Sequence, residues 1–453
     1  MPAQGCAHAP CRSVRQAEGA RAHLAGHRAC TLARRARGRY RSTASCQCAD
    51  RSRWAGDGCA MPAGYSACMP WPDDARAAFL PLVETIYLDT ASNAPRLRAV
   101  DTAARAALDG ATSPWRLTSE EWEAAIERVR GLGSRLFHAD AREDADAVAL
   151  VPSVAYAMSM VAASWPLAAG ERVVMLDAEF PSVLLPWQRR CRQAGAVLAT
   201  VGRERATADL VALIEHTPVA LLVLTESHWR DGRRIDLDQI ARAAHARGIP
   251  LVLDLSQSLG VLPCDVARWR PAFAMSVTYK WLLGGKGLTL LWAAPEWRER
   301  IEPLEGHWQT LAPETSWWFE AGMIPAYRPG ARRFDAGEIP DMLRLAVTEA
   351  GLRHVLDWSP GAIAGHLDMI IGHLARRLAD AGLAAWCITP RSPHLLGLRP
   401  DHAAISAVRS ALRDNGIVCI ERDGVFRVAP HLHVDTAQMD VVANVLIAAS
   451  HRG

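Results

Sequence analysis

The chain has 453 residues, more than the roughly 250–300 that one hydrophobic core can organise, so two domains are the starting expectation. Half of the residues are apolar, but no uninterrupted apolar stretch reaches the ~18 residues of a membrane-spanning helix. The net charge of +3 is close to neutral and argues neither for nor against binding to nucleic acid.

Residues 1–68 differ from the rest of the chain in charge and cysteine content. They hold 11 arginines, three acidic residues and seven of the 11 cysteines, without apolar periodicity. A zinc module would need wider pairing than Cys46 and Cys48 provide, so we predict no metal site. An Arg-rich, acid-poor segment is typical of a transit peptide, although such peptides seldom carry so many cysteines. We therefore expect a disordered leader, or a start codon placed too early with the protein beginning at Met61 or Met69.

The other four cysteines are scattered along the chain: Cys191, Cys264, Cys387 and Cys419. Scattered, unpaired cysteines are typical of a reducing compartment. We therefore expect a cytoplasmic protein.

From about residue 118 the chain alternates between helical and strand patterns. Thr118-Ser119-Glu120-Glu121 is a capping-box sequence at the start of a helix that runs towards His138. Asp236 is expected to cap a helix ending at Gly248, and residues 186–195 to form another. Apolar runs predict strands at 147–151, 172–176, 219–224, 249–253, 273–277 and 287–292. Continuous apolar strands separated by helices indicate a mostly parallel sheet, whose ligands lie at the carboxyl ends of the strands.

The pattern changes after about Pro325. Two helical segments, 342–356 and 361–381, precede short strands predicted near 386–388, 394–398 and 425–428. We therefore predict an α/β protein with an N-terminal segment and large domain over residues 69–325. A smaller α+β domain follows over residues 326–453.

Only two of the 51 basic residues Lys and Arg are lysines, Lys280 and Lys286. An arginine side chain stays protonated, whereas a lysine amine can lose its proton and attack a carbonyl carbon. Lys280 follows an apolar run and precedes a glycine-containing turn, a placement that suggests a Schiff base to pyridoxal phosphate. The count alone is equally compatible with two leftover surface lysines.

Asp254 stands at the carboxyl end of an apolar strand, 26 residues before Lys280. A lone aspartate there could simply cap a turn. Together with the lysine it has a second interpretation, because pyridoxal chemistry needs an acid that keeps the pyridine nitrogen protonated. Gln257, one turn further on, could donate a hydrogen bond to the phenolic oxygen of the cofactor.

These blocks resemble the class V aminotransferases, a group of fold-type I pyridoxal phosphate enzymes that includes cysteine desulfurases, kynureninase and isopenicillin N epimerase-like proteins. The resemblance covers about residues 85–440 and begins with Tyr87-Leu88-Asp89-Thr90-Ala91-Ser92, which is similar to the opening strand and turn of the family. It implies an aspartate aminotransferase-like fold, pyridoxal 5'-phosphate as cofactor, an amino-acid-like substrate and a homodimer.

The resemblance also implies the residues that hold the cofactor. Pro152-Ser153-Val154-Ala155-Tyr156 is similar to the phosphate loop, where backbone amides at a helix N-terminus cradle the anion. A hydroxyl is common at the position of Ala155, so here the phosphate must rely more on the backbone, on Ser153 or on Tyr279.

Two further blocks are similar to cofactor-contacting turns of the family. Glu179-Phe180-Pro181-Ser182 makes Phe180 the expected cover over the pyridine ring, although alone it would be interpreted as ordinary core. Ser227-His228-Trp229-Arg230 implies that His228 approaches the phenolic oxygen or the substrate, although a lone histidine is usually structural. Lys286, in the following glycine turn, is not expected to be catalytic.

Two arginines are implied in substrate binding. Arg427, in Val425-Phe426-Arg427-Val428, is similar to the family arginine that clamps the substrate carboxylate with a bidentate pair. Arg333 lies in residues 331–338, a segment similar to one that approaches the active site across a dimer interface, and is the second candidate.

The activity is then weighed within the family and outside it. Desulfurases need a mobile cysteine shortly before the clamping arginine, and the one nearby, Cys419, lies in an apolar strand-like run. Transamination therefore ranks first, sulfur transfer lower, and racemisation, epimerisation or lyase chemistry between them. An effector-sensing regulator with a nucleic-acid-binding leader would need amphipathic helices that residues 1–68 do not offer. We predict an aminotransferase without a nucleic-acid or membrane partner.

Overall fold

The computed structural model describes residues 75–312, 320–323, 325–338 and 341–451. These residues all belong to one compact unit, Pro62–Gly453. The leader predicted for residues 1–68 lies outside the described residues. Within the part that is described, no helix is long and apolar enough to cross a membrane.

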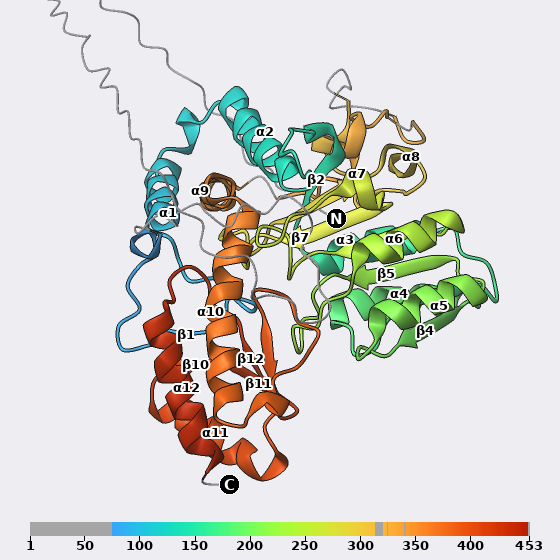
Figure 1. Ribbon diagram of the computed structural model, residues 1–453. Helices are drawn as coiled ribbons and strands as arrows, with labels where there is room; N and C mark the ends of the chain where they lie inside the picture. Colours follow the sequence, from blue (N-terminus) through green and yellow to red (C-terminus); the bar gives the residue numbers. More distant parts are fainter. Residues whose placement is uncertain (1–74, 313–319, 324, 339–340, 452–453) are drawn as a thin grey trace, which may run out of the picture. The chain divides into compact units, whose positions relative to one another are not determined.

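A seven-stranded sheet with the order β2-β8-β7-β6-β5-β3-β4 forms the centre of this unit (Figure 1). The neighbours from β7 to β4 run parallel, while β8 pairs antiparallel with both β7 and β2. The strands are β2 (Val148–Val151), β3 (Arg172–Leu176), β4 (Val197–Val201), β5 (Leu221–Thr225), β6 (Leu251–Asp254), β7 (Phe273–Val277) and β8 (Thr289–Ala293). The predicted α/β class with a mostly parallel sheet is confirmed.

One strand of this sheet was not predicted. β4 is the edge strand next to β3, and four of its five residues are exposed or only partly buried. An edge strand does not need the continuous apolar run that marks a strand buried on both faces. Its sequence therefore lacks the signal that identified the inner strands.

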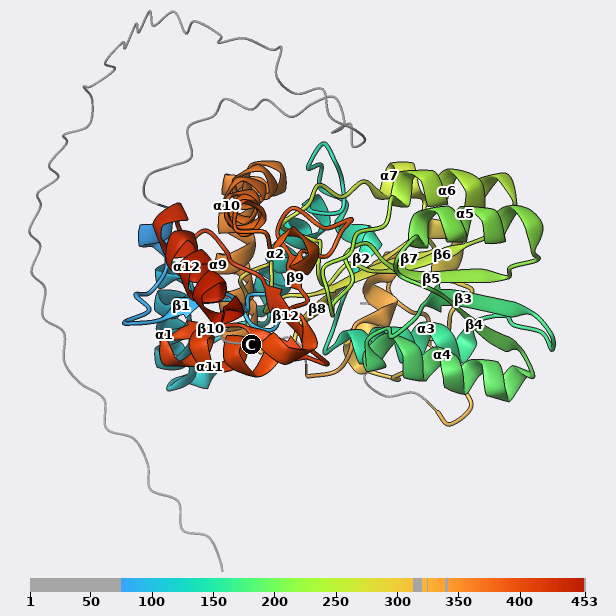
Figure 2. The ribbon, with the colours of Figure 1, turned by 60° about the horizontal axis from the view of Figure 1, so that its bottom comes forward.

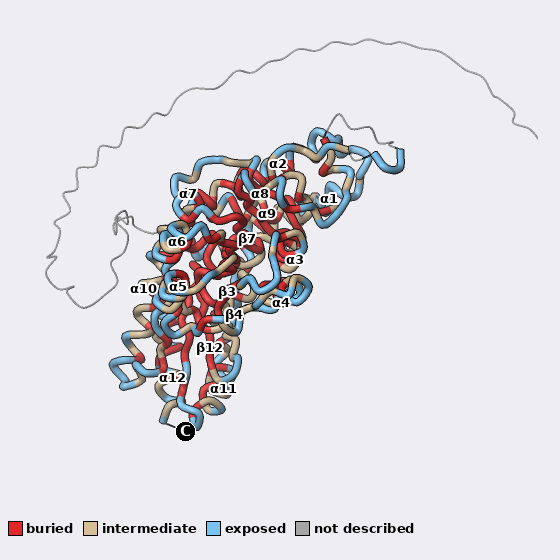
Figure 3. The backbone as a smooth tube through the Cα atoms, turned by 90° about the vertical axis from the view of Figure 1, so that its right-hand side faces the viewer, coloured by how far each residue is buried: buried red, intermediate tan, exposed pale blue. Residues whose placement is uncertain are grey.

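Helices cover both faces of the sheet (Figure 2). On one face lie α5 (Ala206–His216), α6 (Leu237–Ala246) and α7 (Val266–Trp269), in a core cluster with Leu222, Leu224, Leu251 and Leu253. On the other lie α3 (Val154–Ser164) and α4 (Pro181–Ala194), in a cluster with Leu221, Val223 and Val252. Successive residues of a strand point to opposite faces, so each inner strand contributes to both cores. Figure 3 shows these strands as the buried part of the chain.

Three more helices join the first of these clusters. They are α1 (Arg98–Ala111), α2 (Ser119–Arg135) and α9 (Met342–Trp358), and α9 packs against the other two. The capping box predicted at Thr118 is present, with both reciprocal hydrogen bonds. The helix predicted at 186–195 begins earlier, at Pro181. The fixed φ of a proline suits the first turn, and Pro186 lies inside the helix.

A third core cluster is formed mainly by the C-terminal part of the chain. It joins α10 (Pro360–Asp380), α11 (Ile405–Asp414) and α12 (Thr436–Ser450) to a small antiparallel sheet of β9 (Leu396–Leu398), β11 (Ile420–Arg422) and β12 (Val425–Val428). β1 (Ile86–Tyr87) pairs in parallel with β10 (Ile417–Val418), which brings the start of the described chain to this region. The domain boundary near residue 325 stays a prediction.

The strand predicted near 386–388 is wrong. Residues Ala384–Trp386 form a 3-10 helix, and only an isolated bridge joins Cys387 to Leu398. The apolar side chains that suggested a strand are buried because the segment packs against α10. The short α8 (Pro295–Arg298) follows β8.

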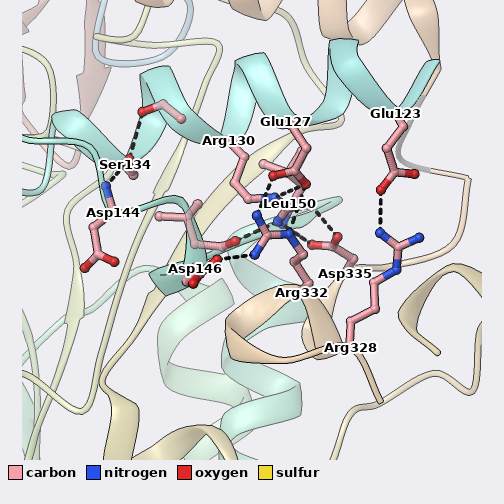
Figure 4. A network of polar contacts seen from close by, with 12 residues as sticks. Glu123, Glu127, Arg130, Ser134, Asp144, Asp146, Leu150, Arg328, Arg332 and Asp335 are labelled. Carbon is pink, nitrogen blue, oxygen red and sulfur yellow. Dashed lines mark hydrogen bonds and ion pairs between the residues drawn. The ribbon is translucent and has the colours of Figure 1, made fainter. Parts of the chain in front are cut away.

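A buried ion-pair network holds β2 in place (Figure 4). Arg130 on α2 is 1% exposed and pairs with Asp335 through both terminal nitrogens, at 3.1 and 2.7 Å. The same guanidinium donates to the Val148 carbonyl at 2.6 Å, and Asp335 accepts from the Leu150 amide at 2.8 Å. Arg332 and Glu127 extend the network. Strand β2, which leads into Ser153, is therefore held through a backbone carbonyl, that of Val148, and a backbone amide, that of Leu150.

Candidate active site

A cavity with about 580 Å³ of empty space, including open solvent at its mouth, lies at the carboxyl ends of β2, β3, β5, β6 and β7. Residues from all five strand ends meet here, as expected for a ligand site of a parallel sheet. The lining residues are Pro152, Ser153, Val154, Ala155, Glu179, Phe180, Ser182, Thr225, Trp229, Asp254, Ser256, Gln257, Val277, Tyr279 and Lys280.

One end of the cavity is the N-terminus of α3. Ser153 is the N-cap residue, and its hydroxyl accepts a hydrogen bond from the Tyr156 amide at 3.0 Å. The amides of the first helical turn have no acceptor within the helix and point towards the cavity end, where the helix dipole favours an anion. Val154 and Ala155 line this end, and the lining contains no arginine. An anion here would depend on backbone amides and on hydroxyl groups.

Lys280 brings an amine into the cavity. Its Nζ lies 5.8 Å from the ring centroid of Phe180 and 5.8 Å from that of Tyr279. Burial lowers the pKa of Lys280 to about 8, an effect that the nearby Asp254 partly offsets. The uncharged form, which can act as a nucleophile, is therefore much more populated near neutral pH than in an ordinary lysine, although the protonated form still dominates there. Lys286 is exposed and does not line the cavity.

Asp254 ends β6 and is 8% exposed. Its Oδ1 accepts a hydrogen bond from the Ser256 amide at 2.9 Å. Burial raises the pKa of Asp254, because a carboxylate loses its hydration there. A cationic group bound next to it would stabilise the ionised form.

Gln257 is 4% exposed and is held at both ends of its amide. Its Nε2 donates to the Ala91 carbonyl at 3.0 Å, and its Oε1 accepts from the Trp281 indole at 2.9 Å. Phe180 stands at the rim, 38% exposed, with its ring edge-on to Trp229 at 5.2 Å. Both residues line the cavity, and their contact with a cofactor stays a prediction.

Seven residues that the sequence analysis did not select as site residues also line the cavity: Pro152, Glu179, Ser182, Thr225, Trp229, Ser256 and Val277. Glu179 is 5% exposed, and its Oε2 accepts from the Phe180 amide while its Oε1 has no partner. Burial and the neighbouring Asp254 raise the pKa of Glu179 to about 8. Its position at the end of a strand was an available signal, but a single glutamate before a turn has no specific pattern.

Three predicted residues lie outside the cavity lining. His228 is 1% exposed with Nδ1 3.4 Å from Asp231, and its neighbour Trp229 takes the place in the wall. Arg333 stacks on Tyr327, 4.8 Å from the ring centroid. The roles predicted for His228 and Arg333 stay predictions.

Arg427 is 3% exposed and already has protein partners. Its guanidinium binds Asp89 at 2.8 Å and Ser92 at 2.9 Å, and donates to the Trp229 carbonyl. Its Nε has no partner. Arg427 adjoins the cavity through Trp229, but a substrate carboxylate would have to share it with Asp89.

The family model "Aminotransferase class-V" matches residues 86–436. This chain belongs to the class-V aminotransferase family. An uncharacterized aminotransferase of Bacillus subtilis, YcbU, is 28% identical over 324 residues, which cover 70% of this chain and 83% of that protein. The isopenicillin N epimerase of Streptomyces clavuligerus is 28% identical over 334 residues, covering 72% of this chain and 82% of that protein.

Solved structures agree with the fold. The apo structure of a cysteine desulfurase from Thermococcus onnurineus superposes with a TM-score of 0.73 at 17% identity, covering 86% of this chain and 100% of that one. At this identity the likeness shows the fold alone. Membership of the family makes the protein a class-V enzyme that acts on amino acids with pyridoxal phosphate as cofactor.

The cavity fits pyridoxal phosphate in each of its parts. The α3 N-terminus suits the phosphate, Phe180 presents an aromatic face, and Asp254 supplies the acid for a ring nitrogen. Gln257 has one N–H beyond the one given to Ala91, and Lys280 carries a desolvated amine. These features meet in one cavity, although they come from four separate strand ends.

Proposed function

We propose that the enzyme is an aminotransferase, which transfers the amino group of an amino acid to a keto acid. The observation that carries this proposal is a desolvated Lys280 amine in a cavity whose described lining contains no thiol. The nearest candidate for a sulfur-accepting cysteine, Cys419, is mostly buried, and burial raises its pKa to about 12. A thiol with that pKa is protonated and a poor nucleophile at neutral pH, so sulfur transfer is disfavoured.

The chain's own residues then have distinct tasks. When bound, pyridoxal phosphate supplies an aldehyde carbon and a ring that accepts electrons from the substrate α-carbon. The Lys280 Nζ holds the cofactor and moves the proton at the substrate α-carbon. Asp254 keeps a proton on the ring nitrogen, while Phe180 covers the ring. Ser153, the amides of Val154 and Ala155, and Tyr279 hold the phosphate.

Substrate binding is assigned to Arg427. A guanidinium bound to a carboxylate suits recognition of an α-amino acid. Its unpartnered Nε and its contact with the cavity wall through Trp229 support this role, and Asp89 would share the guanidinium with the substrate. We further expect a cytoplasmic homodimer, which sedimentation of the purified enzyme would test.

A half-reaction screen tests the proposal. The cofactor-loaded enzyme is incubated with single amino acids and no acceptor, and the corresponding keto acid is measured by mass spectrometry. We expect stoichiometric keto acid from at least one donor, and catalytic amounts once an acceptor keto acid is added. Inversion of the α-carbon without keto acid would indicate a racemase or epimerase. Alanine formed from cysteine, with the sulfur left as a persulfide on the enzyme, would indicate a desulfurase. Either outcome would overturn the proposal.

A further inference from the structure

The residue after the candidate lysine makes a specific hydrogen bond that no role described so far requires. Trp281 is 1% exposed, and its Nε1 donates to the Gln257 Oε1 at 2.9 Å. Gln257 lines the cavity, whereas Trp281 does not. Trp281 therefore contacts a residue of the candidate active site without being part of the cavity lining itself.

The two partners of Gln257 determine which way its amide group points. An indole nitrogen can only donate a hydrogen bond, and the Ala91 carbonyl can only accept one. With Oε1 towards Trp281 and Nε2 towards Ala91, both hydrogen bonds form. In the flipped amide, an N–H would face the indole N–H and an oxygen would face the carbonyl. Both buried hydrogen bonds would be lost, which is costly.

This orientation leaves one donor for a ligand. The amide nitrogen carries two protons, and the Ala91 carbonyl takes one of them. The second N–H belongs to a side chain in the cavity wall. An oxygen that accepts hydrogen bonds, such as an ionised phenolic oxygen, is therefore favoured over a hydroxyl that must donate.

The indole itself is fixed by its surroundings. The His394 ring packs edge-on against Trp281 with centroids 4.5 Å apart, and the His431 ring stacks on the indole at 5.8 Å. The His394 Nε2 lies 2.6 Å from the main-chain oxygen of Gln257, so the same histidine contacts both partners. Both histidines are fully buried, which leaves the indole little freedom to rotate.

We propose that Trp281 is a positioning residue, whose indole N–H fixes the Gln257 amide so that an N–H of Gln257 faces the cofactor's phenolic oxygen. Lys280 and Trp281 then place the cofactor together, the first as its amine anchor and the second through Gln257. The proposal rests on pyridoxal phosphate occupying this cavity, but not on which reaction the enzyme catalyses.

The substitution that tests it is Trp281→Phe, which keeps an aromatic ring and removes the donor. The matched control is Trp187→Phe. Trp187 is also fully buried, but its Nε1 has no hydrogen-bond partner. Pyridoxal phosphate affinity is measured by titrating the apo-enzyme and following the cofactor absorbance. Loss of one hydrogen bond should weaken binding about three- to tenfold in Trp281→Phe, and Trp187→Phe should bind as the wild type does.

A double-mutant cycle distinguishes positioning from a general packing effect. If Trp281 acts only through Gln257, adding Trp281→Phe to Gln257→Leu should weaken cofactor binding no further than Gln257→Leu alone. Additive losses, or equal losses in the two tryptophan variants, would overturn the proposal. A wild-type enzyme that binds no pyridoxal phosphate would contradict the cofactor assignment and the proposed function instead.

A measurement on the apo-enzyme covers the case in which Trp281→Phe does not fold. With ¹⁵N-labelled indole groups, one buried indole proton of the wild type should exchange with solvent faster in Gln257→Leu, because its acceptor is gone. Unchanged exchange at every indole would show that the hydrogen bond does not form in solution, and would overturn the proposal.

Discussion

Two polar clusters flank β2, and they differ in how their groups are paired. The network around Arg130 gives the buried guanidinium a carboxylate at each edge and a backbone carbonyl. The cavity beyond the end of the strand contains Glu179 with an unpartnered Oε1 and Lys280 with a pKa lowered to about 8. Buried polar groups are normally satisfied, so an unsatisfied group at a cavity wall indicates where a ligand belongs. Buried charge by itself does not mark a functional site.

Residues 331–338 contribute to the paired cluster around Arg130. The segment is similar to one near the active site in the family, its predicted approach across a dimer interface stays a prediction, and it contains four charged residues, Arg332, Arg333, Asp335 and Glu338. Its Asp335 and Arg332 are paired with α2 and with the residues before β2. These contacts hold β2, the strand that leads to the N-terminus of α3 at one end of the cavity.

The largest expected effect comes from the amine in the cavity. Lys280→Arg should abolish turnover while leaving the free energy of unfolding nearly unchanged, because a guanidinium cannot form the bond to the cofactor. The matched control is Lys286→Arg, at the other lysine of the chain, which is exposed. Borohydride reduction and peptide mapping of the wild type should place the cofactor on Lys280. A label on Lys286 would refute the assignment.

The next effect concerns Arg427, which shares features with both clusters. It is ion-paired within the protein, and it is also proposed to bind the substrate carboxylate. Arg427→Ala should lower kcat/KM for amino acids by about 2–5 kcal/mol in transition-state free energy, with cofactor absorbance retained. Asp89→Asn is the control for the loss of the ion pair. It should preserve or improve amino-acid binding, because Arg427 then has a free carboxylate site. A loss of the cofactor band with unchanged amino-acid affinity would contradict the clamp role.

Substitutions in the ion-paired network around Arg130 should lower the stability of the fold and leave catalysis nearly unchanged. Arg130→Met leaves Asp335 buried without its partner, so the free energy of unfolding should fall by about 3–5 kcal/mol. Urea unfolding measures this change, and kcat per folded enzyme should stay near the wild-type value. The variant Arg130→Met with Asp335→Leu should recover part of the stability, because no unpaired charge remains. A large loss of kcat in a stably folded Arg130→Met enzyme would place the network in catalysis.

The smallest effect is a pH dependence of cofactor attachment. The uncharged amine is the nucleophile, so attachment of pyridoxal phosphate to the apo-enzyme should become faster as pH rises through about 8. The pKa of Glu179 is also raised to about 8, and Glu179→Gln separates the two groups. The midpoint should persist in Glu179→Gln, as followed by stopped-flow absorbance. Its disappearance there would assign the titration to Glu179.

The sequence by itself determined the sheet and most of the cavity wall. The inner strands are buried on both faces, so they must be apolar throughout, and polar residues directly after them must gather at one edge. This logic indicated Asp254 and Gln257, the scarcity of lysine indicated Lys280, and the family resemblance added Ser153; all four line the cavity. The edge strand β4 escaped because its partial exposure removes that constraint.

Only the tertiary structure decided which polar groups are paired and which are free. Asp89, which pairs with Arg427, and Asp335, which pairs with Arg130, are each more than 200 residues away in sequence from their partner. Trp281 reaches Gln257 from a different strand end. No local pattern encodes such contacts, because they depend on how separate strands and helices are packed together. The same holds for Trp229 and His228: adjacent in sequence, they point to different surroundings, and only one of them lines the cavity.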